Sequence, residues 1–328
     1  MRLLLQAHSL KHIAVGLTKA LTKLGLNVDV LTREMQTALE LLGSTPRNFS
    51  SFRLLLGLLG ARSRSVRKLR IFYLPVLPRR HANKFIFEFW FNTYLRLFAR
   101  NYDIAHTHAS YYIAPIKIAD IGLNVVHTVH ASEFILYNFV WGLEKAPHAC
   151  RRSYVEDLVC VKRLAERGYK ITAVSYFMRD LLKRYIGVCS EVVYNGCDLT
   201  RFNINVSGKS MKRIIGAPED KKVVLWIART ALGKDPLTFL KAISIIKKDR
   251  DDMIFVIIGR GPLDMIIERE IKLLKLENTL IWLRGYIPHE MMPYLYAMSD
   301  VFVATYLYEA FGMTVAEAMA CLLYTSDA

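Results

Sequence analysis

The segment KVVLWIARTALGKDPLTFLKAISIIKKDRDDMIFVII, residues 222–258, decides the fold class of this chain. Two apolar runs, Lys222–Ala228 and Met253–Ile258, have the length and composition of strands, and Pro236–Lys248 between them has helical periodicity. Short apolar strands that alternate with helical segments are the pattern of a parallel sheet covered by helices. The segment therefore predicts a strand, helix and strand of an α/β domain.

The same alternation continues on both sides of this segment. Towards the C-terminus we expect helices at Leu263–Leu276 and near His289–Met298, with strands at Thr279–Leu283 and Asp300–Ala304. Towards the N-terminus we expect strands at Met1–Ala7, Asn27–Thr32, Asp103–His108, Asn124–His130 and Lys170–Val174, a helix at Lys11–Leu24, and a helix that begins at Ser175 as N-cap. At Asp198–Asp220 Asn, Ser, Gly and Lys replace the apolar periodicity, which predicts a linker.

A chain of 328 residues exceeds what one hydrophobic core usually organises. We therefore predict two Rossmann-like domains, residues 1–200 and 201–328, with parallel sheets facing a cleft. Ligands of such sheets gather at the carboxyl ends of the strands. His106, His108, His127, His130 and Ser175 all follow or end such strands, so we expect them to point towards one crevice.

Cysteine usage and hydropathy indicate a cytoplasmic protein. The five cysteines are scattered and form no Cys-x-x-Cys pair, which favours free thiols in a reducing compartment. Residues 1–7 are too short for the apolar region of a signal peptide. The longest uncharged apolar stretch, Phe134–Leu143, is about half of the roughly 20 residues that a membrane span needs.

Most of the net charge of +16 lies between Arg47 and Arg100. This stretch contains twelve Lys or Arg and one acid, Glu88, and therefore has a net charge of +11. Interleaved apolar residues make it a candidate for binding an anionic membrane surface. The alternative is a solvated basic face that covers ordinary core helices. We expect no nucleic acid, because no nucleic-acid motif accompanies the charge.

Arg229 and Lys234 are the first candidate site residues. They follow the predicted strand Lys222–Ala228 and therefore lie on a loop at its carboxyl end. An Arg fork and a mobile Lys charge can together stabilise the negative charge of a departing nucleoside diphosphate. Basic residues in a solvated loop explain the same pattern, so these two residues alone do not decide the function.

A second constellation comprises Glu309, Glu317 and the segment between them. Glu309 is expected in a loop, and Glu317 falls about one and a half turns into a helix that starts near Gly312. Carboxylates accept hydrogen bonds from sugar hydroxyls, and the helix amides around Phe311, Gly312 and Met313 favour a phosphate group. The alternative is a solvated acid followed by an acid that complements the helix dipole.

Taken together, the motifs resemble glycosyltransferase family 4. Six segments occur in the order and spacing of that family: Arg229 with Lys234, Val192–Asp198 followed by Phe202, Gly259–Pro262, Arg284–Tyr286, Ser299–Val301 and Glu309–Ala320. The resemblance covers residues 101–320. It implies a GT-B fold in which the first domain binds the acceptor and the second domain binds a nucleotide-diphosphate sugar.

The resemblance also implies roles for individual residues. Arg229 and Lys234 would contact the diphosphate, Glu309 the hydroxyls of the donor sugar and Glu317 the ribose. His130 matches the family's histidine on the N-terminal side of the donor site. Members of the family retain the anomeric configuration and need no metal, so we expect no cofactor and no obligatory metal.

Some of these residues have other interpretations. Gly259 with Gly261, and Asn195 with Gly196, are turn signals first and donor-binding candidates second. The segment at Gly259 is not a dinucleotide fingerprint, because no third glycine follows at the required place. The four histidines at the strand ends could also form a metal site. Hydrogen-bonded structural histidines are the alternative that we favour for all of them except His130.

The chain departs from the family at both ends. His8 and Ser9 stand where the family usually has a Gly-Gly pair, which leaves acceptor binding and the true N-terminus open. After Cys321 the family continues with a Gly-x-Pro segment, whereas this chain ends with Leu322–Ala328. We therefore expect a truncated second domain with an exposed sheet edge, low solubility and weak activity.

The sequence predicts a retaining glycosyltransferase that moves a sugar from a nucleotide-diphosphate donor to a glycan or lipid-linked acceptor. We expect it in the cytoplasm, at the inner face of the cytoplasmic membrane through residues 47–100. The alternatives are a GT-B nucleotide-sugar epimerase and a non-catalytic module that binds sugar nucleotides or membranes. The sequence does not choose the sugar, the base, the acceptor or the oligomeric state.

Overall fold

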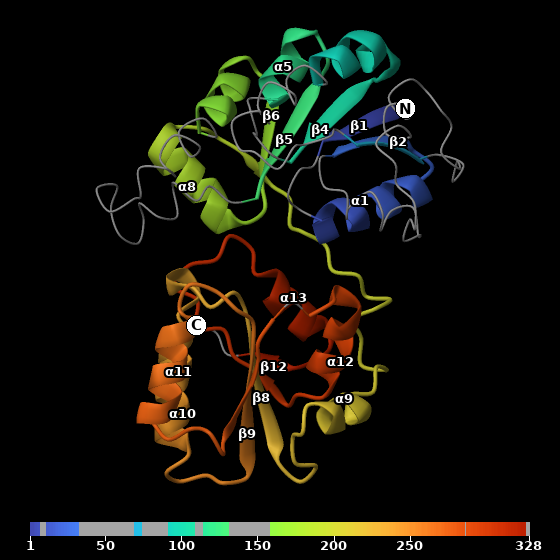
Figure 1. Cartoon of the computed structure of the whole chain (residues 1–328). Helices are drawn as coiled ribbons and strands as arrows, with labels where there is room; N and C mark the ends of the chain where they lie inside the picture. The colour runs from blue at the N-terminus through green and yellow to red at the C-terminus, as the bar shows by residue number, and fades with distance from the viewer. Residues whose placement is uncertain are drawn as a thin grey trace. The chain divides into compact units, whose positions relative to one another are not determined.

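The computed structural model describes residues 1–6, 11–32, 69–73, 91–108, 114–130, 158–285 and 287–325 (Figure 1). The chain divides into two compact units, Met1–Gly196 and Cys197–Ala328, close to the expected boundary after residue 200. Each unit contains a parallel sheet with helices, so the predicted α/β class is confirmed. No helix among the described residues is long and apolar enough to span a bilayer. The greater part of the basic stretch 47–100 lies outside the described residues.

The first unit is built on a seven-stranded parallel sheet with the order β3-β2-β1-β4-β5-β6-β7. Its strands are β1 (Arg2–Gln6), β2 (Asn27–Thr32), β3 (Leu69–Tyr73), β4 (Ile104–Thr107), β5 (Val125–Val129), β6 (Lys170–Ala173) and β7 (Glu191–Val192). Because β4 and β5 are adjacent and parallel, the residues that follow them come to the same edge of the sheet.

The helices of the first unit are α1 (Lys11–Lys23), α5 (Ala114–Asp120), α8 (Tyr176–Ile186) and the 3-10 helix η1 (Ala99–Asn101), with further helical residues at 91–98 and 158–166. Helix α8 begins as predicted. Its N-cap is Ser175, whose hydroxyl oxygen accepts a hydrogen bond of 3.1 Å from the amide of Met178. The helix ends at Gly187, which has φ +69° and donates its amide to the last turn.

The second unit contains a five-stranded parallel sheet with the order β10-β9-β8-β11-β12. Its strands are β8 (Lys222–Ile227), β9 (Met253–Ile258), β10 (Leu280–Leu283), β11 (Val301–Phe302) and β12 (Tyr324–Thr325). Its helices are α9 (Lys209–Ile214), α10 (Pro236–Ile246), α11 (Asp264–Leu273), α12 (Met292–Ala297) and α13 (Met313–Ala320), with 3-10 helices η4 (Leu232–Lys234) and η5 (His289–Met291).

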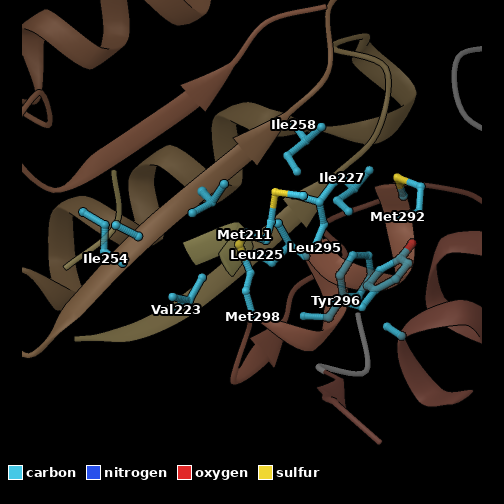
Figure 2. Close-up of a cluster of buried hydrophobic side chains, with 14 of the residues drawn as sticks. Met211, Val223, Leu225, Ile227, Ile254, Ile258, Met292, Leu295, Tyr296 and Met298 are labelled. Carbon is cyan, nitrogen blue, oxygen red and sulfur yellow. The ribbon is translucent and has the colours of Figure 1, made fainter. Parts of the chain in front are cut away.

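Helices cover both faces of this second sheet. Helices α10 and α11 lie on one face and α9, α12 and α13 on the other (Figure 1). Alternate residues of β8 enter the two cores: Val224 and Trp226 pack against α10 and α11, while Val223, Leu225 and Ile227 face the other helices (Figure 2). The central strand is therefore buried on both sides, as its uncharged run predicts.

The segment expected as a linker is instead part of the second unit. Phe202 and Met211 are buried in the core that Figure 2 shows in part, and α9 lies within this segment. Local periodicity missed it because the helix has only six residues and contributes one buried side chain. Two other expected elements are shorter than predicted: the helix near His289–Met298 starts as η5, and the strand at Asp300–Ala304 is reduced to β11.

The residues after α13 extend the second sheet. Strand β12 pairs in parallel with β11, with Val301 opposite Tyr324. It is the edge strand of the sheet, and the side chains of Leu322 and Tyr324 are exposed beside it.

Gly259 joins the loop after β9 to the loop after β8. It has φ +141°, and a Cβ atom at this position would lie 1.9 Å from the carbonyl oxygen of Ala228. A Cβ atom on Gly261 would lie 2.6 Å from the carbonyl oxygen of Thr230. Close approach of the two loops, more than a tight turn, is therefore what requires glycine at these positions.

Gly259→Ala should destabilise the protein strongly, because the added methyl group meets a neighbouring carbonyl. Gly285 is a matched control: it has φ +131° but nothing within 4 Å of an added Cβ. We expect Gly285→Ala to cost about 1–3 kcal/mol from backbone strain alone, and Gly259→Ala to cost about 2 kcal/mol more. Equilibrium unfolding in urea measures both values, and equal losses would contradict the close approach.

Candidate functional site

The loop that follows β8 carries the two predicted cations. Arg229 is exposed, and among the described residues its guanidinium has no hydrogen-bond or ion-pair partner. Lys234 ends η4, and Asp235 then caps α10 by accepting a hydrogen bond of 3.2 Å from the amide of Thr238. Both cations thus lie at the carboxyl end of the central strand, as predicted.

Lys234 forms an ion pair with Glu309, which lies 75 residues later in the chain. The ammonium group also lies 4.3 Å from the centre of the Tyr306 ring, a cation–π contact. The second carboxylate oxygen of Glu309 accepts a hydrogen bond of 3.0 Å from the amide of Ala310. The side chains of Lys234 and Glu309 are 27% and 34% exposed, so a ligand can reach both.

Hydrogen bonds hold together the two loops that carry this ion pair. The hydroxyl of Thr305 donates to the carbonyl of Asp235 at 2.7 Å and accepts from the indole N–H of Trp226 at 3.0 Å. The amide of Leu307 donates to the carbonyl of Gly233 at 3.1 Å. The cation and the carboxylate are therefore fixed relative to each other by backbone contacts as well as by their charges.

Gly312 and the start of α13 lie next to Glu309. Gly312 is the N-cap, with φ +76°, and a Cβ atom there would lie 3.4 Å from Cγ of Glu309. Phe311 precedes this cap, and Met313 is the first helical residue. The first amides of a helix lack partners within the helix and carry a partial positive charge. The structure thus brings together Lys234, Glu309 and a helix N-terminus, and Arg229 lies on the same loop as Lys234.

Glu317 has a different environment from Glu309. Its side chain is 5% exposed, and both carboxylate oxygens are occupied. One oxygen contacts Nε2 of His289 at 2.9 Å, and the other accepts a hydrogen bond of 2.9 Å from the hydroxyl of Tyr296. Burial, followed by the charge of Glu317, raises the pKa of Tyr296 well above its usual value, so this phenol stays protonated. Sequence analysis did not identify His289 or Tyr296 as site residues.

The other glycine candidates lie in two different parts of the chain. Gly259 lies at the carboxyl end of β9, against the loop that carries Arg229. Asn195 and Gly196 lie where the two units join, and residues 193–198 form no turn, so the predicted turn is wrong. Gly196 has open space around an added Cβ.

His130 belongs to the first unit, where it follows β5. Its Nε2 lies 2.7 Å from Nδ1 of His108, which follows the adjacent strand β4. His106 contacts the hydroxyl of Thr128 at 2.7 Å, and His127 contacts that of Thr107 at 2.8 Å. No group of three or more possible metal ligands occurs among the residues that the structure describes.

Burial lowers the pKa of all four histidines. The pKa falls to about 4 for His106 and His130 and to about 3 for His127, and it lies well below the usual range for His108. Neighbouring imidazoles add to the effect at His108, His127 and His130. These side chains are therefore neutral at pH 7.

Two family models match the chain. The model described as Glycosyltransferase Family 4 matches residues 12–201, more than half of the chain. The chain belongs to this family. The model described as Glycosyl transferases group 1 matches residues 208–324, which include the loop, ion pair and helix described above.

Two curated relatives of this family 4 member are similar to it over part of each chain. An uncharacterized glycosyltransferase of Methanocaldococcus jannaschii is 26% identical over 62% of the chain and 58% of the relative. Alpha-monoglucosyldiacylglycerol synthase of Streptococcus pneumoniae is 24% identical over 66% of the chain and 50% of the relative. The chain thus spans about half the length of these relatives.

Solved structures show that this family 4 chain has the GT-B fold. Sucrose-phosphate synthase from Thermosynechococcus elongatus superimposes with a TM-score of 0.72 at 19% identity, over 99% of this chain and 80% of that one. Anabaena HepE, solved in complex with UDP and glucose, gives a TM-score of 0.68 at 16% identity over the same shares. At these identities the comparison concerns the fold alone. It gives no support to the epimerase or the non-catalytic alternative.

Acid should destabilise the first unit of this family 4 member. His106, His127 and His130 bind a proton near pH 6.5 when unfolded but only near pH 3–4 when folded, so the unfolded state binds more protons between these values. Stability therefore falls as the pH drops from about 6.5 towards 4, by about 1 kcal/mol per histidine between pH 7 and pH 5.5.

Urea unfolding at a series of pH values tests this expectation. The variant His106→Gln removes one titrating ring and keeps a donor towards Thr128. Its stability should depend less steeply on pH than that of the wild type. A stability that stays constant between pH 7 and pH 5 would contradict the expectation.

Proposed function

We propose that this chain carries out retaining glycosyl transfer from a nucleotide-diphosphate sugar. The observation that carries the proposal is the ion pair of Lys234 and Glu309 beside the N-terminus of α13. A cation, helix amides and a carboxylate within one site suit a donor that joins a diphosphate to a sugar. The names of the family and of its relatives support this reaction class.

The proposed roles follow the chemistry of each group. Arg229, Lys234 and the amides around Phe311–Met313 bind the diphosphate and stabilise the charge that develops as it leaves. Glu309 accepts hydrogen bonds from hydroxyls of the donor sugar. Glu317 binds the ribose hydroxyls with the lone pairs that His289 and Tyr296 leave unused.

The remaining candidates lie outside the loop that carries Lys234 and the start of α13. Gly259 keeps the loop beside Arg229 close to the donor site, and Asn195 with Gly196 would contact the donor from the segment between the units. His130 would contact the donor from the first unit. We propose that the protein's own cations and amides replace an obligatory metal ion.

The acceptor is proposed to be a glycan or a lipid-linked molecule at the inner face of the cytoplasmic membrane. The S. pneumoniae relative is named as a monoglucosyldiacylglycerol synthase, which supports a lipid acceptor. The basic stretch 47–100, net charge +11, supports attraction to an anionic membrane surface.

Replacing Arg229 or Lys234 by Ala should lower turnover on the order of 100- to 1,000-fold, because each removes a cation from the leaving diphosphate. The assay follows release of UDP, GDP or ADP from the corresponding sugar nucleotides in the presence of a lipid and glycan extract. Lys241→Ala on α10 and Arg213→Ala on α9 are matched controls, since both side chains are exposed and lie outside the site. Variants at 229 and 234 that keep the wild-type rate would overturn the proposal, and NMR of the product tests retention.

Neutralising the basic stretch should weaken membrane binding. We expect the replacement of Arg62, Arg64, Arg67, Lys68 and Arg70 by Gln to lower binding to phosphatidylglycerol vesicles at least ~10-fold, since each charge near an anionic surface contributes about 1 kcal/mol. Flotation of vesicles measures binding, and neutral phosphatidylcholine vesicles serve as the control. Unchanged binding to the anionic vesicles would show that this stretch is a solvated basic face.

A further inference from the structure

Four polar side chains form a connected group of contacts around Glu317. Arg201 contacts His289, and both His289 and Tyr296 contact Glu317. Arg201 donates from Nη2 to the backbone carbonyl of His289 at 2.9 Å, and its Nη1 lies 3.3 Å from Nδ1 of the same residue. Nε2 of His289 contacts Glu317 at 2.9 Å, and Tyr296 donates to the other carboxylate oxygen. The ring of Phe202, itself buried, lies 5.5 Å from the His289 ring.

The contact with Arg201 decides which nitrogen of His289 carries the proton. A guanidinium has only donors, so Nδ1 of His289 must accept and cannot carry a hydrogen. In the neutral ring the hydrogen is then on Nε2, which donates it to Glu317. A hydrogen on Nδ1 would face the donors of Arg201, so the guanidinium favours the Nε2–H tautomer.

This arrangement leaves a defined part of the Glu317 carboxylate unused. Each carboxylate oxygen can accept more than one hydrogen bond, and His289 and Tyr296 take one on each oxygen. Because a donor occupies each oxygen, the carboxylate cannot rotate without losing two hydrogen bonds. The remaining lone pairs suit two neighbouring hydroxyl groups, such as those of a ribose.

We propose that Arg201 and His289 are positioning residues that orient Glu317 towards the ribose hydroxyls of a nucleoside diphosphate. The proposal rests on the proposed function, because it assumes a nucleotide at this site. Arg201 acts through the tautomer of His289, and His289 acts through the carboxylate. Neither residue needs to touch the nucleotide.

The experiment compares nucleotides with and without the hydroxyls that Glu317 would bind. Calorimetry with UDP, GDP and ADP identifies the base that the wild type prefers, and the matching 2′,3′-dideoxynucleoside diphosphate is then measured. His289→Ala should weaken binding of the ribose form at least ~10-fold, since a hydrogen bond to a charged group is lost, and should change binding of the dideoxy form less than ~2-fold. Arg201→Ala should act in the same direction with a smaller effect.

Conservative and control variants separate positioning from a general structural role. His289→Gln keeps a donor for Glu317 and an acceptor for Arg201, so it should restore most of the affinity. Tyr294 lies on α12, the helix that carries Tyr296, but its side chain is exposed. Tyr294→Phe should therefore have no effect. Thermal melts check that each variant is folded.

A spectroscopic measurement tests the role of Arg201 without a nucleotide. Long-range ¹H–¹⁵N spectra of the histidine rings should show His289 as the Nε2–H tautomer in the wild type, with its signals assigned by their loss in His289→Gln. In Arg201→Ala the signals should shift towards a mixture of tautomers. An unchanged tautomer would overturn the role proposed for Arg201.

The outcomes distinguish the two proposals. If the wild type binds no nucleoside diphosphate, the proposed function fails and this inference fails with it. If the wild type binds the ribose and dideoxy forms equally, or His289→Ala weakens both equally, the positioning of Glu317 is refuted while the diphosphate site stands.

Discussion

The burial of β8 on both faces is the constraint on which the second unit depends. Its neighbours β9 and β11 pair with it in parallel, and Trp226 is fully buried on one side while Leu225 is fully buried on the other. A strand enclosed in this way cannot shift in register without exposing apolar side chains to water. Its carboxyl end, and with it the loop that carries Arg229 and Lys234, is therefore held at a defined place.

The ion pair at the end of this strand matters for the position of its two charges and contributes little to the stability of the fold. Lys234 and Glu309 are each about one-third exposed, and pairs with this exposure contribute little to folding. The two loops are joined independently through Thr305, which contacts Trp226 and Asp235. A diphosphate could therefore compete for Lys234 without loosening the loops. That property suits a binding site better than a structural salt bridge.

The sequence predicted those features that depend on local patterns. Strand β9 was predicted to the residue, and the cap at Ser175 was predicted from its place between a strand and the helix that follows. The partners of Glu317 were not predicted, because His289 and Tyr296 lie 28 and 21 residues before it and no local signal links them. For the same reason the core contacts of Phe202 and Met211 were missed, and their segment was interpreted as a linker.

Glu309 lies in the loop before α13 and Glu317 lies within that helix, and their carboxylates have different environments. Glu309 and Glu317 are eight residues apart, yet one faces a cation in a partly exposed loop and the other contacts His289 and Tyr296 in the core. The partly exposed carboxylate of Glu309 can be reached by a ligand, whereas the buried carboxylate of Glu317 is held on both oxygens and can accept only groups of fixed geometry. Ribose is common to nucleotide donors and the sugar is not. Under the proposed function, the fixed carboxylate of Glu317 suits the shared ribose, and the more accessible carboxylate of Glu309 suits the sugar.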